Sequence, residues 1–381
     1  MKAQVLQESF HKALRAVAWA LPSKAMIRST NVILLTVEQG RIQMEATDLE
    51  THATAYCPAI VEEEGIYLVQ GRQLLETVAL MTQERIQLAS DGTKVTLKAG
   101  KSRASMATRD LEDFPTHSSL AQSSPARNIQ AGALLDAIHA VSFAAVSGPH
   151  QVSMPMLQGV NLEIEPGVFR LTGCDSSRVA FSSVPSPGPL SKAITIPAGP
   201  FEAAVKMLSE EPKADVILVF DHSSVSLTVP NLASYRIQLL AATYPEVRRF
   251  IPANNPTIVT TNPKELADAI RFAQVFQGDS VIINLSIAAA GITVSASEEI
   301  GDAEHEVPAT LLGQPLTLSL NSLFVLDWLE KQTGKVEISF LDDAHPVLFR
   351  AAGALPGDCY VCMPVYSKQP DPTVSKEAAG R

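Results

Sequence analysis

Several short stretches of the chain contain residue types that could do chemistry, and Gly100-Lys101-Ser102 is the first. A glycine followed by lysine and serine ends the phosphate-binding loop of many nucleotide-binding proteins. That loop also needs a glycine five residues earlier, where this chain has Val95. The segment joins two predicted strands rather than opening a helix. We therefore expect no nucleotide-phosphate site there.

Cys359 and Cys362 have the C-x-x-C spacing of redox and zinc sites. They lie in a segment that predicts a strand, and residues three apart on a strand face opposite sides of a sheet. We therefore interpret them as structural cysteines, with a redox or zinc role as the alternative. Cys57 and Cys174 lie far away in the sequence, so the four cysteines predict no disulfide framework.

The remaining candidates for chemistry are histidines and acidic pairs. The eight histidines have no metal-ligand spacing, and Asp342-Asp343 is typical of a turn between strands. The motifs G-x-G-x-x-G, G-x-S-x-G and H-E-x-x-H do not occur. Catalysis needs convergent groups, and no block of the chain offers a distinct set. We therefore expect a non-catalytic protein without a metal or cofactor.

The elements that would position these residues occur three times. Residues 1–21, 127–146 and 257–277 each predict a short strand, a polar N-cap region and an amphipathic helix. Each opens a block that closes with a second helix, three strands and a proline-marked end. A period of this size indicates a repeated domain rather than a solenoid unit.

Three copies of two helices and about eight strands predict an α+β protein with antiparallel sheets. The predicted helices span residues 9–21, 71–81, 132–146, 200–208, 263–276 and 321–332. Linkers rich in proline, serine and asparagine separate the blocks. The predicted divisions are domain I at 1–117, domain II at 127–252, domain III at 256–366 and a disordered tail at 367–381.

Net charge is unevenly distributed along the chain. Of the total of −10, residues 253–366 contribute −9. An acidic chain argues against tight, phosphate-driven binding of nucleic acid, although it leaves room for loose contact through a locally basic surface. No apolar run reaches 18 residues and the N-terminus has no signal-like apolar region, so we expect a cytoplasmic protein.

Six segments in a fixed order carry a family resemblance. They are TDLE (47–50), RASMATRDLEDFP (103–115), LQGVNLEIE (157–165), CDSSRVA (174–180), YPEVRRFIP (244–252) and YVCMPV (360–365). In this order, inside a threefold repeat, they make residues 1–366 resemble the bacterial DNA polymerase III beta subunit, the sliding clamp.

The resemblance implies a DNA clamp fold and a head-to-tail homodimer that forms a ring of six similar domains. Such a ring encircles double-stranded DNA without sequence specificity and is a processivity factor in DNA replication and DNA repair. It is not an enzyme. Its implied partners are DNA polymerase subunits, the clamp loader and repair proteins, which bind through short linear motifs, and its implied location is the cytoplasm at the nucleoid.

The resemblance also implies a partner-binding pocket between the second and third blocks. Ser177 stands where the family usually has an aromatic or imidazole ring, and Val365 stands where it usually has methionine. The matching pocket positions are Leu157, Cys174, Ser176, Ser177, Arg178, Val179, Pro245, Arg249, Phe250, Val361, Met363, Pro364 and Val365.

The candidates for DNA contact are cations on the predicted helices and residues of loops to which the resemblance assigns DNA contacts. A clamp must slide, so its contacts with phosphate should be few and weak. The candidates are Lys12, Arg15, Lys24, Arg28, Arg72, His150, Gln151, Lys206, Lys264 and Arg271, with Lys331 as a further helix cation.

Opposite charges mark the two edges that the resemblance brings together in the dimer. A cationic edge on the first block facing an anionic edge on the third would favour head-to-tail pairing. Ala104 replaces a usual aromatic there, and Phe276 is bulkier than the usual aliphatic residue. The candidate interface residues are Lys98, Lys101, Arg103, Ala104, Met106, Val275, Phe276, Glu298, Glu299 and Glu304, with Glu306 on the same acidic edge.

Two alternatives remain open at this point. One is a divergent second-copy or mobile-element clamp with altered client specificity, which the changed pocket positions suggest. The other is an enzyme that uses the interdomain cleft, with Asp175, Arg178 and Arg249 as its charged cluster.

Overall fold

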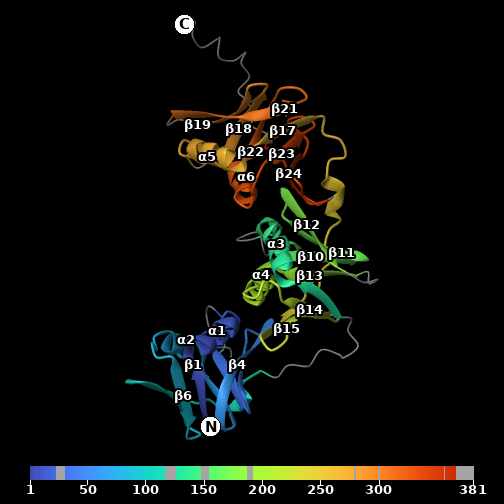
Figure 1. Cartoon of the computed structure of the whole chain (residues 1–381). Helices are drawn as coiled ribbons and strands as arrows, with labels where there is room; N and C mark the ends of the chain where they lie inside the picture. The colour runs from blue at the N-terminus through green and yellow to red at the C-terminus, as the bar shows by residue number, and fades with distance from the viewer. Residues whose placement is uncertain are drawn as a thin grey trace. The chain divides into compact units, whose positions relative to one another are not determined.

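The structure is a computed structural model (Figure 1) that describes residues 1–22, 31–115, 126–146, 154–186, 192–278, 280–298, 301–355 and 357–365. The predicted tail at 367–381 lies outside these residues. The chain divides into two compact units. Unit 1 is Met1–Ile138, Gln158–Phe169 and Val184–Thr243, and unit 2 is His139–Leu157, Arg170–Ser183 and Tyr244–Arg381.

Unit 1 contains all of the first repeat and most of the second. Strands β11 (Gly167–Cys174) and β12 (Arg178–Ser186) pass from one unit into the other. The other elements are β1 (Lys2–Leu6), α1 (Gln7–Ala18), β2 (Val32–Glu38), β3 (Arg41–Thr47), β4 (Thr51–Glu63), β5 (Gly65–Gln70), α2 (Gly71–Ala79), β6 (Arg85–Ser90), β7 (Lys94–Ala99), β8 (Ser102–Ala107), the 3₁₀ helix η2 (Leu111–Asp113), β9 (Ala126–Gln130), α3 (Ala131–His139), β10 (Gly159–Glu165), β13 (Lys192–Pro197), α4 (Ala198–Leu208), β14 (Asp215–Phe220), β15 (Ser224–Val229) and β16 (Ala233–Gln238).

A 12-stranded antiparallel sheet forms the body of unit 1. Its main path runs β8-β7-β6-β1-β4-β16-β15-β14-β9, and β2, β3 and β5 branch from β4. Alternating burial shows why these segments are strands: in β14 only Val216, Leu218 and Phe220 are buried. Helix α1 contacts β4. Its side chains Phe10 and Leu14 are fully buried.

Tyr235 joins the two repeats inside unit 1. It lies on β16, is fully buried, and its hydroxyl donates to the carbonyl oxygen of Ala16 in α1 at 2.9 Å. Its ring also lies 5.4 Å from that of Trp19. A strand of the second repeat is therefore fixed to the first helix of the chain.

Unit 2 contains the third repeat and the adjoining part of the second. Its elements are the 3₁₀ helices η3 (Ser142–Ala144), η5 (Pro155–Gln158) and η6 (Val247–Phe250), with β17 (Thr257–Thr261), α5 (Pro263–Gln274), β18 (Ile282–Ala288), β19 (Gly291–Glu298), β20 (Gly301–Val307), β21 (Ala309–Leu312), β22 (Leu316–Asn321), α6 (Ser322–Leu329), β23 (Val336–Phe340), β24 (Val347–Ala351) and β25 (Cys359–Cys362).

Two antiparallel sheets and an aromatic core form unit 2. The part of a nine-stranded sheet that belongs to unit 2 runs β11-β12-β25-β24-β23-β17-β21, and a four-stranded sheet runs β20-β19-β18-β22. Helices α5 and α6 pack against each other, as Figure 1 shows. The ring of Trp328 on α6 lies 5.4 Å from Phe349 and stacks on Tyr360 at 6.1 Å. The Tyr360 hydroxyl donates to the carbonyl oxygen of Phe324, so α6 is held on the sheet by both packing and a hydrogen bond.

The prediction of one helix over 132–146 is wrong. Helix α3 ends at His139, and the short helix η3 follows after Val141, whose φ and ψ are −128° and −28°. The Val141 carbonyl lies so close to Gly173 that a Cβ there would come within 2.0 Å of the oxygen. This contact between segments distant in sequence turns the chain out of the helix.

Three smaller predictions also need correction. Helix α1 begins after Leu6 without a side-chain cap, whereas Asn262 and Asn321 cap α5 and α6 as polar N-caps should. The predicted strand at 304–309 divides into β20 and β21, because Pro308 cannot donate to the ladder. The last strand ends at Cys362 rather than at 365.

The turn predicted at Asp342-Asp343 is confirmed. Asp342 lies between β23 and β24 and accepts hydrogen bonds from the backbone N–H groups of Ala344 and His345, both at 2.9 Å.

Among the helices of the described ranges, none is long and apolar enough to cross a membrane.

All four cysteines are buried and free. Cys359 and Cys362 both lie on β25, as the C-x-x-C segment predicted. Burial raises the pKa of Cys57, Cys174 and Cys362 to about 12 and that of Cys359 to about 11. Since the thiolate is the reactive form, we expect these thiols to react slowly in the folded chain.

We predict that a disulfide reagent such as dithionitrobenzoate reacts slowly with the folded chain at pH 8. Raised pKa values and burial should slow the reaction at least about a hundredfold relative to the chain in guanidinium, where all four cysteines are exposed. Absorbance of the released thiol measures both rates. One rapidly released equivalent from folded protein would contradict the prediction.

Candidate functional site

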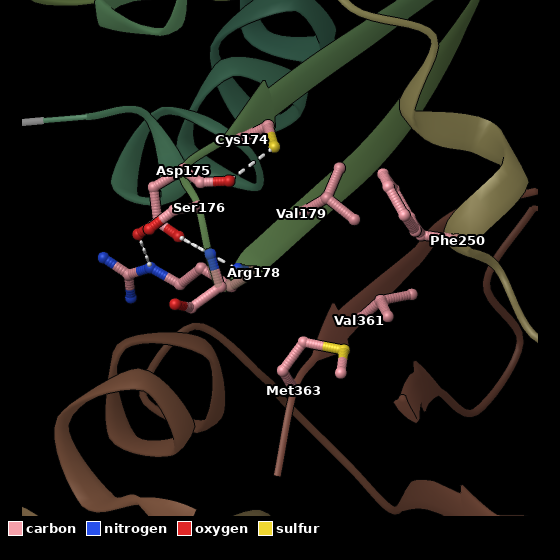
Figure 2. Close-up of a pocket in the computed structure, with 9 residues that line it drawn as sticks. Cys174, Asp175, Ser176, Arg178, Val179, Phe250, Val361 and Met363 are labelled. Carbon is pink, nitrogen blue, oxygen red and sulfur yellow. Dashed lines mark hydrogen bonds and ion pairs between the residues drawn. The ribbon is translucent and has the colours of Figure 1, made fainter. Parts of the chain in front are cut away.

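The candidate site is a pocket of about 260 Å³ in unit 2 (Figure 2). Its floor is formed by Val179 of β12 and Val361 of β25, which are opposite partners in the antiparallel pair and are both buried. Opposite residues of such a pair project from the same face of the sheet. The two valines therefore form one continuous apolar surface.

A packed apolar cluster supports this floor. Leu157, Cys174 and Val247 are buried in the same cluster as Val179 and Val361. Its other members are Val146, Phe181, Leu348 and Cys359, with Met156, Tyr244 and Ile251 packed against it. Because close-packed interiors deform little, the floor of the pocket is a firm surface.

Two exposed apolar side chains form the walls. Phe250, at the end of η6, is 46% exposed, and Met363, just after β25, is 40% exposed. Figure 2 shows both side chains grouped around the two floor valines. Large apolar groups on a monomer surface that border a pocket are a feature of binding sites.

A tight turn between β11 and β12 forms the polar side of the pocket. The Oδ1 atom of Asp175 accepts hydrogen bonds from the backbone N–H groups of Ser177 at 2.7 Å and Arg178 at 2.9 Å. The backbone N–H of Asp175 donates to the Arg178 carbonyl at 3.0 Å. The Ser177 carbonyl in turn accepts from the backbone N–H of Met363 at 2.9 Å. This turn and one wall of the pocket are thus bonded together.

The guanidinium of Arg178 donates all of its described hydrogen bonds to residues of unit 2. It donates to Asp175 at 2.9 Å, to Asp327 at 2.6 Å and to the Phe143 carbonyl at 2.9 Å, and it lies 4.2 Å from the centre of the Phe324 ring. Burial alone would lower the pKa of Arg178, but the hydrogen bond to Asp327 and the neighbouring negative charges raise it above its usual value. Arg178 is therefore a permanently charged structural anchor.

The structure brings most of the predicted pocket residues together. Among the lining residues are the predicted Cys174, Ser176, Ser177, Arg178, Val179, Phe250, Val361 and Met363. Leu157 lies in the supporting cluster. Pro245, Arg249, Pro364 and Val365 do not line the pocket.

Two of these positions have other contacts that explain their placement. The Arg249 guanidinium lies 5.1 Å from the centre of the Phe250 ring, and the backbone N–H of Val365 donates to the Ser319 carbonyl at 2.9 Å.

Asp175 also lines the pocket, but it is not among the pocket residues predicted from the sequence. The signal that could have found it is an aspartate at the end of a strand followed by two serines, a pattern that favours a side-chain-bonded turn.

The corresponding place in the first repeat has the same backbone but different side chains. Asp48 accepts from the backbone N–H groups of Glu50 at 3.0 Å and Thr51 at 2.6 Å, as Asp175 does in the second repeat. The two floor positions are occupied there by His52 and Arg236, opposite partners on β4 and β16. His52 contacts a glutamate at 3.0 Å, so of these two junctions the one at β12 and β25 has the apolar floor.

The predicted DNA-contacting cations fall into two groups in the described ranges. Arg15, Lys206 and Lys264 are exposed helix residues without an ion pair to any described residue. Lys12 pairs with Glu210 at 3.1 Å, and Arg271 pairs with Asp268 and Glu330, both at 2.8 Å.

Two further predicted cations lie in the described ranges, and four predicted residues do not. Arg72 donates to the carbonyl of Pro22 at 2.9 Å, and the ammonium of Lys331 lies 5.3 Å from the centre of the Phe143 ring. Lys24, Arg28, His150 and Gln151 lie outside the described residues.

The predicted dimer residues lie at strand edges of the two units. In unit 1, Lys98, Lys101 and Arg103 are exposed on β7, β8 and their turn, and β8 is the last strand on its path through the sheet. Ala104 is half-buried and Met106 is buried.

In unit 2, the exposed Glu298 lies at the end of β19, and the exposed Glu304 and Glu306 lie on the edge strand β20. Val275 is 71% exposed and Phe276 is half-buried beside them. Glu299 lies outside the described residues.

The charged cluster of the enzyme alternative does not form as a unit. Asp175 and Arg178 are paired, but Arg249 lies against Phe250 instead. Within the described ranges no group of three or more metal-ligating side chains could hold an ion.

Comparison with known proteins gives the family. The domain families described as DNA polymerase III beta subunit, N-terminal, central and C-terminal domain match residues 1–118, 128–246 and 248–366, respectively. The chain is 25% identical to the beta sliding clamp of Streptomyces coelicolor, over 92% of this chain and 96% of that protein. It is also 25% identical to the beta sliding clamp of Vibrio cholerae, over 90% and 93%.

Solved structures give the same fold. A DNA polymerase III beta subunit from Thermotoga maritima superposes with a TM-score of 0.88 at 22% identity, over 96% of this chain and 99% of that one. A sliding clamp from Pseudomonas aeruginosa bound to griselimycin has a TM-score of 0.90 at 22% identity, over 96% and 100%. The chain belongs to the family of bacterial DNA polymerase III beta subunits, and it is a non-catalytic DNA sliding clamp with the three-domain clamp fold of the beta sliding clamps.

Proposed function

We propose that the pocket around Val179 and Val361 binds short linear motifs of polymerase and repair proteins, and that the chain carries them on duplex DNA as a head-to-tail homodimer. The observation that carries the proposal is the exposed apolar wall of Phe250 and Met363 over a firm floor of two valines. We also propose the cytoplasm at the nucleoid as its location, and 1–117, 127–252 and 256–366 as its domains.

The chemistry of the pocket favours a motif with aliphatic or aromatic side chains. Methionine and phenylalanine adapt to different apolar groups, which suits a site that receives many clients. The half-buried Ser177 puts a small hydroxyl group where the family usually has a ring, and the exposed Ser176 adds a second hydroxyl to the pocket lining. A motif that combines glutamine, which can hydrogen-bond to them, with leucine and phenylalanine fits this arrangement.

Replacement of Phe250 by alanine should weaken binding of a fluorescent peptide with a Gln-Leu-x-Leu-Phe motif about five- to thirtyfold. The substitution removes one apolar wall but touches an exposed side chain, so the fold should persist. Fluorescence anisotropy measures the dissociation constant. Leu355→Ala, which truncates another apolar residue of unit 2 that is 47% exposed, is the control. Equal affinity of Phe250→Ala and the unaltered chain would contradict the proposal.

We propose that the helix cations supply weak, sequence-independent contacts with DNA phosphates. The argument rests on their partners: Arg15, Lys206 and Lys264 have no ion pair within the described residues, while Lys12 and Arg271 are already paired with carboxylates. A paired cation releases little free energy when it exchanges a carboxylate for a phosphate. Contacts of this kind hold DNA loosely, as sliding requires.

Glu330→Gln should therefore tighten binding to linear duplex DNA about two- to fivefold at low salt. It removes one of the two carboxylates that neutralise Arg271, and the gain should vanish as salt rises. A salt series of anisotropy measurements on labelled duplex tests it. Glu337→Gln, at an exposed glutamate of β23, makes the same charge change without touching Arg271. If both variants gain equally, net charge alone is responsible and Glu330 has no special role.

We propose that the dimer joins the cationic edge at β8 to the acidic edge at β20. Lys98, Lys101 and Arg103 on one edge and Glu304 and Glu306 on the other are all exposed. Phe272 and Val275, which are 47% and 71% exposed, lie next to the acidic edge and supply apolar area. Opposite charges at the rim select the head-to-tail arrangement, and the apolar residues contribute most of the affinity.

The double substitution Lys101→Glu with Arg103→Glu should convert the dimer to a monomer of 40.8 kDa at low protein concentration. Like charges would then face each other across the interface. Light scattering after size-exclusion chromatography measures the mass. Adding Glu304→Lys and Glu306→Lys to the same chain should restore the dimer. An intact dimer in the first variant would show that these edges do not meet.

A further inference from the structure

We propose that Asp327 of α6 is a positioning residue for the pocket, which it controls through Arg178 without touching the ligand. This inference rests on the proposed binding of client motifs in the pocket. Asp327 is absent from the pocket lining, and α6 belongs to the third repeat whereas the turn at Asp175 belongs to the second. The two are joined by one side chain.

Arg178 connects Asp327 to the turn at Asp175. Its side chain is only 9% exposed, and each of its three nitrogen positions donates to a different element. The Nη1 atom donates to Asp327 at 2.6 Å, the shortest of the three bonds. The guanidinium is a rigid planar fork, so fixing Nη1 also fixes the direction in which Nε points.

Nε in turn sets the orientation of the Asp175 carboxylate. Oδ2 of Asp175 accepts from Nε at 2.9 Å, and Oδ1 accepts from the backbone N–H groups of Ser177 and Arg178. A carboxylate is planar, so a rotation that breaks one set of bonds disturbs the other. The geometry of the turn therefore depends on the guanidinium, and the guanidinium depends on Asp327.

The same chain of bonds continues to a wall of the pocket. The Ser177 carbonyl accepts from the backbone N–H of Met363 at 2.9 Å. Figure 2 shows the Asp175–Arg178 pair on one side of the drawn residues and Phe250 on the other, with Met363 among the residues that face the pocket. Loss of the Asp327 contact would loosen the turn and this wall together, and a looser wall releases a bound motif faster.

The residue that caps the C-terminus of α6 supplies the matched control. Glu330 lies three residues after Asp327, is similarly exposed at 53% against 45%, and holds Arg271 rather than Arg178. Glu330→Gln and Asp327→Asn therefore remove the same charge, one at the C-cap of α6 and the other within it, and only Asp327 contacts Arg178.

The experiment measures binding of the Gln-Leu-x-Leu-Phe peptide to the full chain and to three variants. Asp327→Asn should weaken the affinity about three- to tenfold, mainly through faster dissociation, while Glu330→Gln leaves it within about twofold. Asp327→Glu keeps a carboxylate and should recover part of the loss. In an Arg178→Lys background, Asp327→Asn should have no further effect, because lysine cannot hold the same set of partners.

Hydrogen exchange of the Ser177 and Arg178 backbone amides gives a readout that does not need a ligand. Both amides should exchange faster in Asp327→Asn and be unchanged in Glu330→Gln. If the unaltered chain binds the peptide and Asp327→Asn binds it equally well, the positioning role is wrong while the proposed function stands. If the unaltered chain binds no peptide, the proposed function fails, and unchanged amide exchange in Asp327→Asn would then overturn the positioning role separately.

Discussion

The antiparallel pairing of β12 with β25 is the constraint on which the site depends. It aligns Val179 with Val361, residues that lie far apart in the sequence, and it brings Met363 to the Ser177 carbonyl. A register shift of one residue would move the side chain of Val361 to the other face of the sheet. A neighbour of Val361 in β25 would then take its place in the floor. The apolar cluster below makes such a slip costly, because Val361 packs there with Leu157 and Val247. Binding surface and core thus rely on the same register.

The repeats show that the backbone alone does not make a pocket. Asp48 and Asp175 form the same turn, and each turn leads into an equivalent pair of strands. At β4 and β16 the paired positions hold His52 and Arg236, which contact the carboxylates of Glu45 and Asp221 instead of presenting an apolar surface. On the proposal that the pocket binds client motifs, this difference leaves one of the two junctions as the candidate site. The two junctions thus share a register and differ in the side chains that occupy it.

Much of the fold was predictable because its signals are local. Strand β14 matches the predicted range, since alternation of buried and exposed residues is set by neighbours in sequence. The end of α3 was not predictable, because it depends on the close approach of Val141 to Gly173. The pocket could be predicted from its resemblance to a family, yet the role of Arg178 could not. Its partner Asp327 lies 149 residues away, and only the folded chain shows that the guanidinium is committed to protein groups.

Charge is a further constraint, because a sliding clamp must remain on DNA although its contacts with the phosphates are weak. The third repeat carries most of the net negative charge, and it places carboxylates directly on its own cations, as Asp268 and Glu330 do on Arg271. An arginine held this way stays positively charged but gains little from a phosphate, since each new contact requires the loss of an old one. If Arg271 faces the duplex, as we propose, the energy of DNA contact varies little as the duplex moves past it. On this view the acidity of the chain favours movement along DNA, and topology rather than affinity keeps the clamp in place.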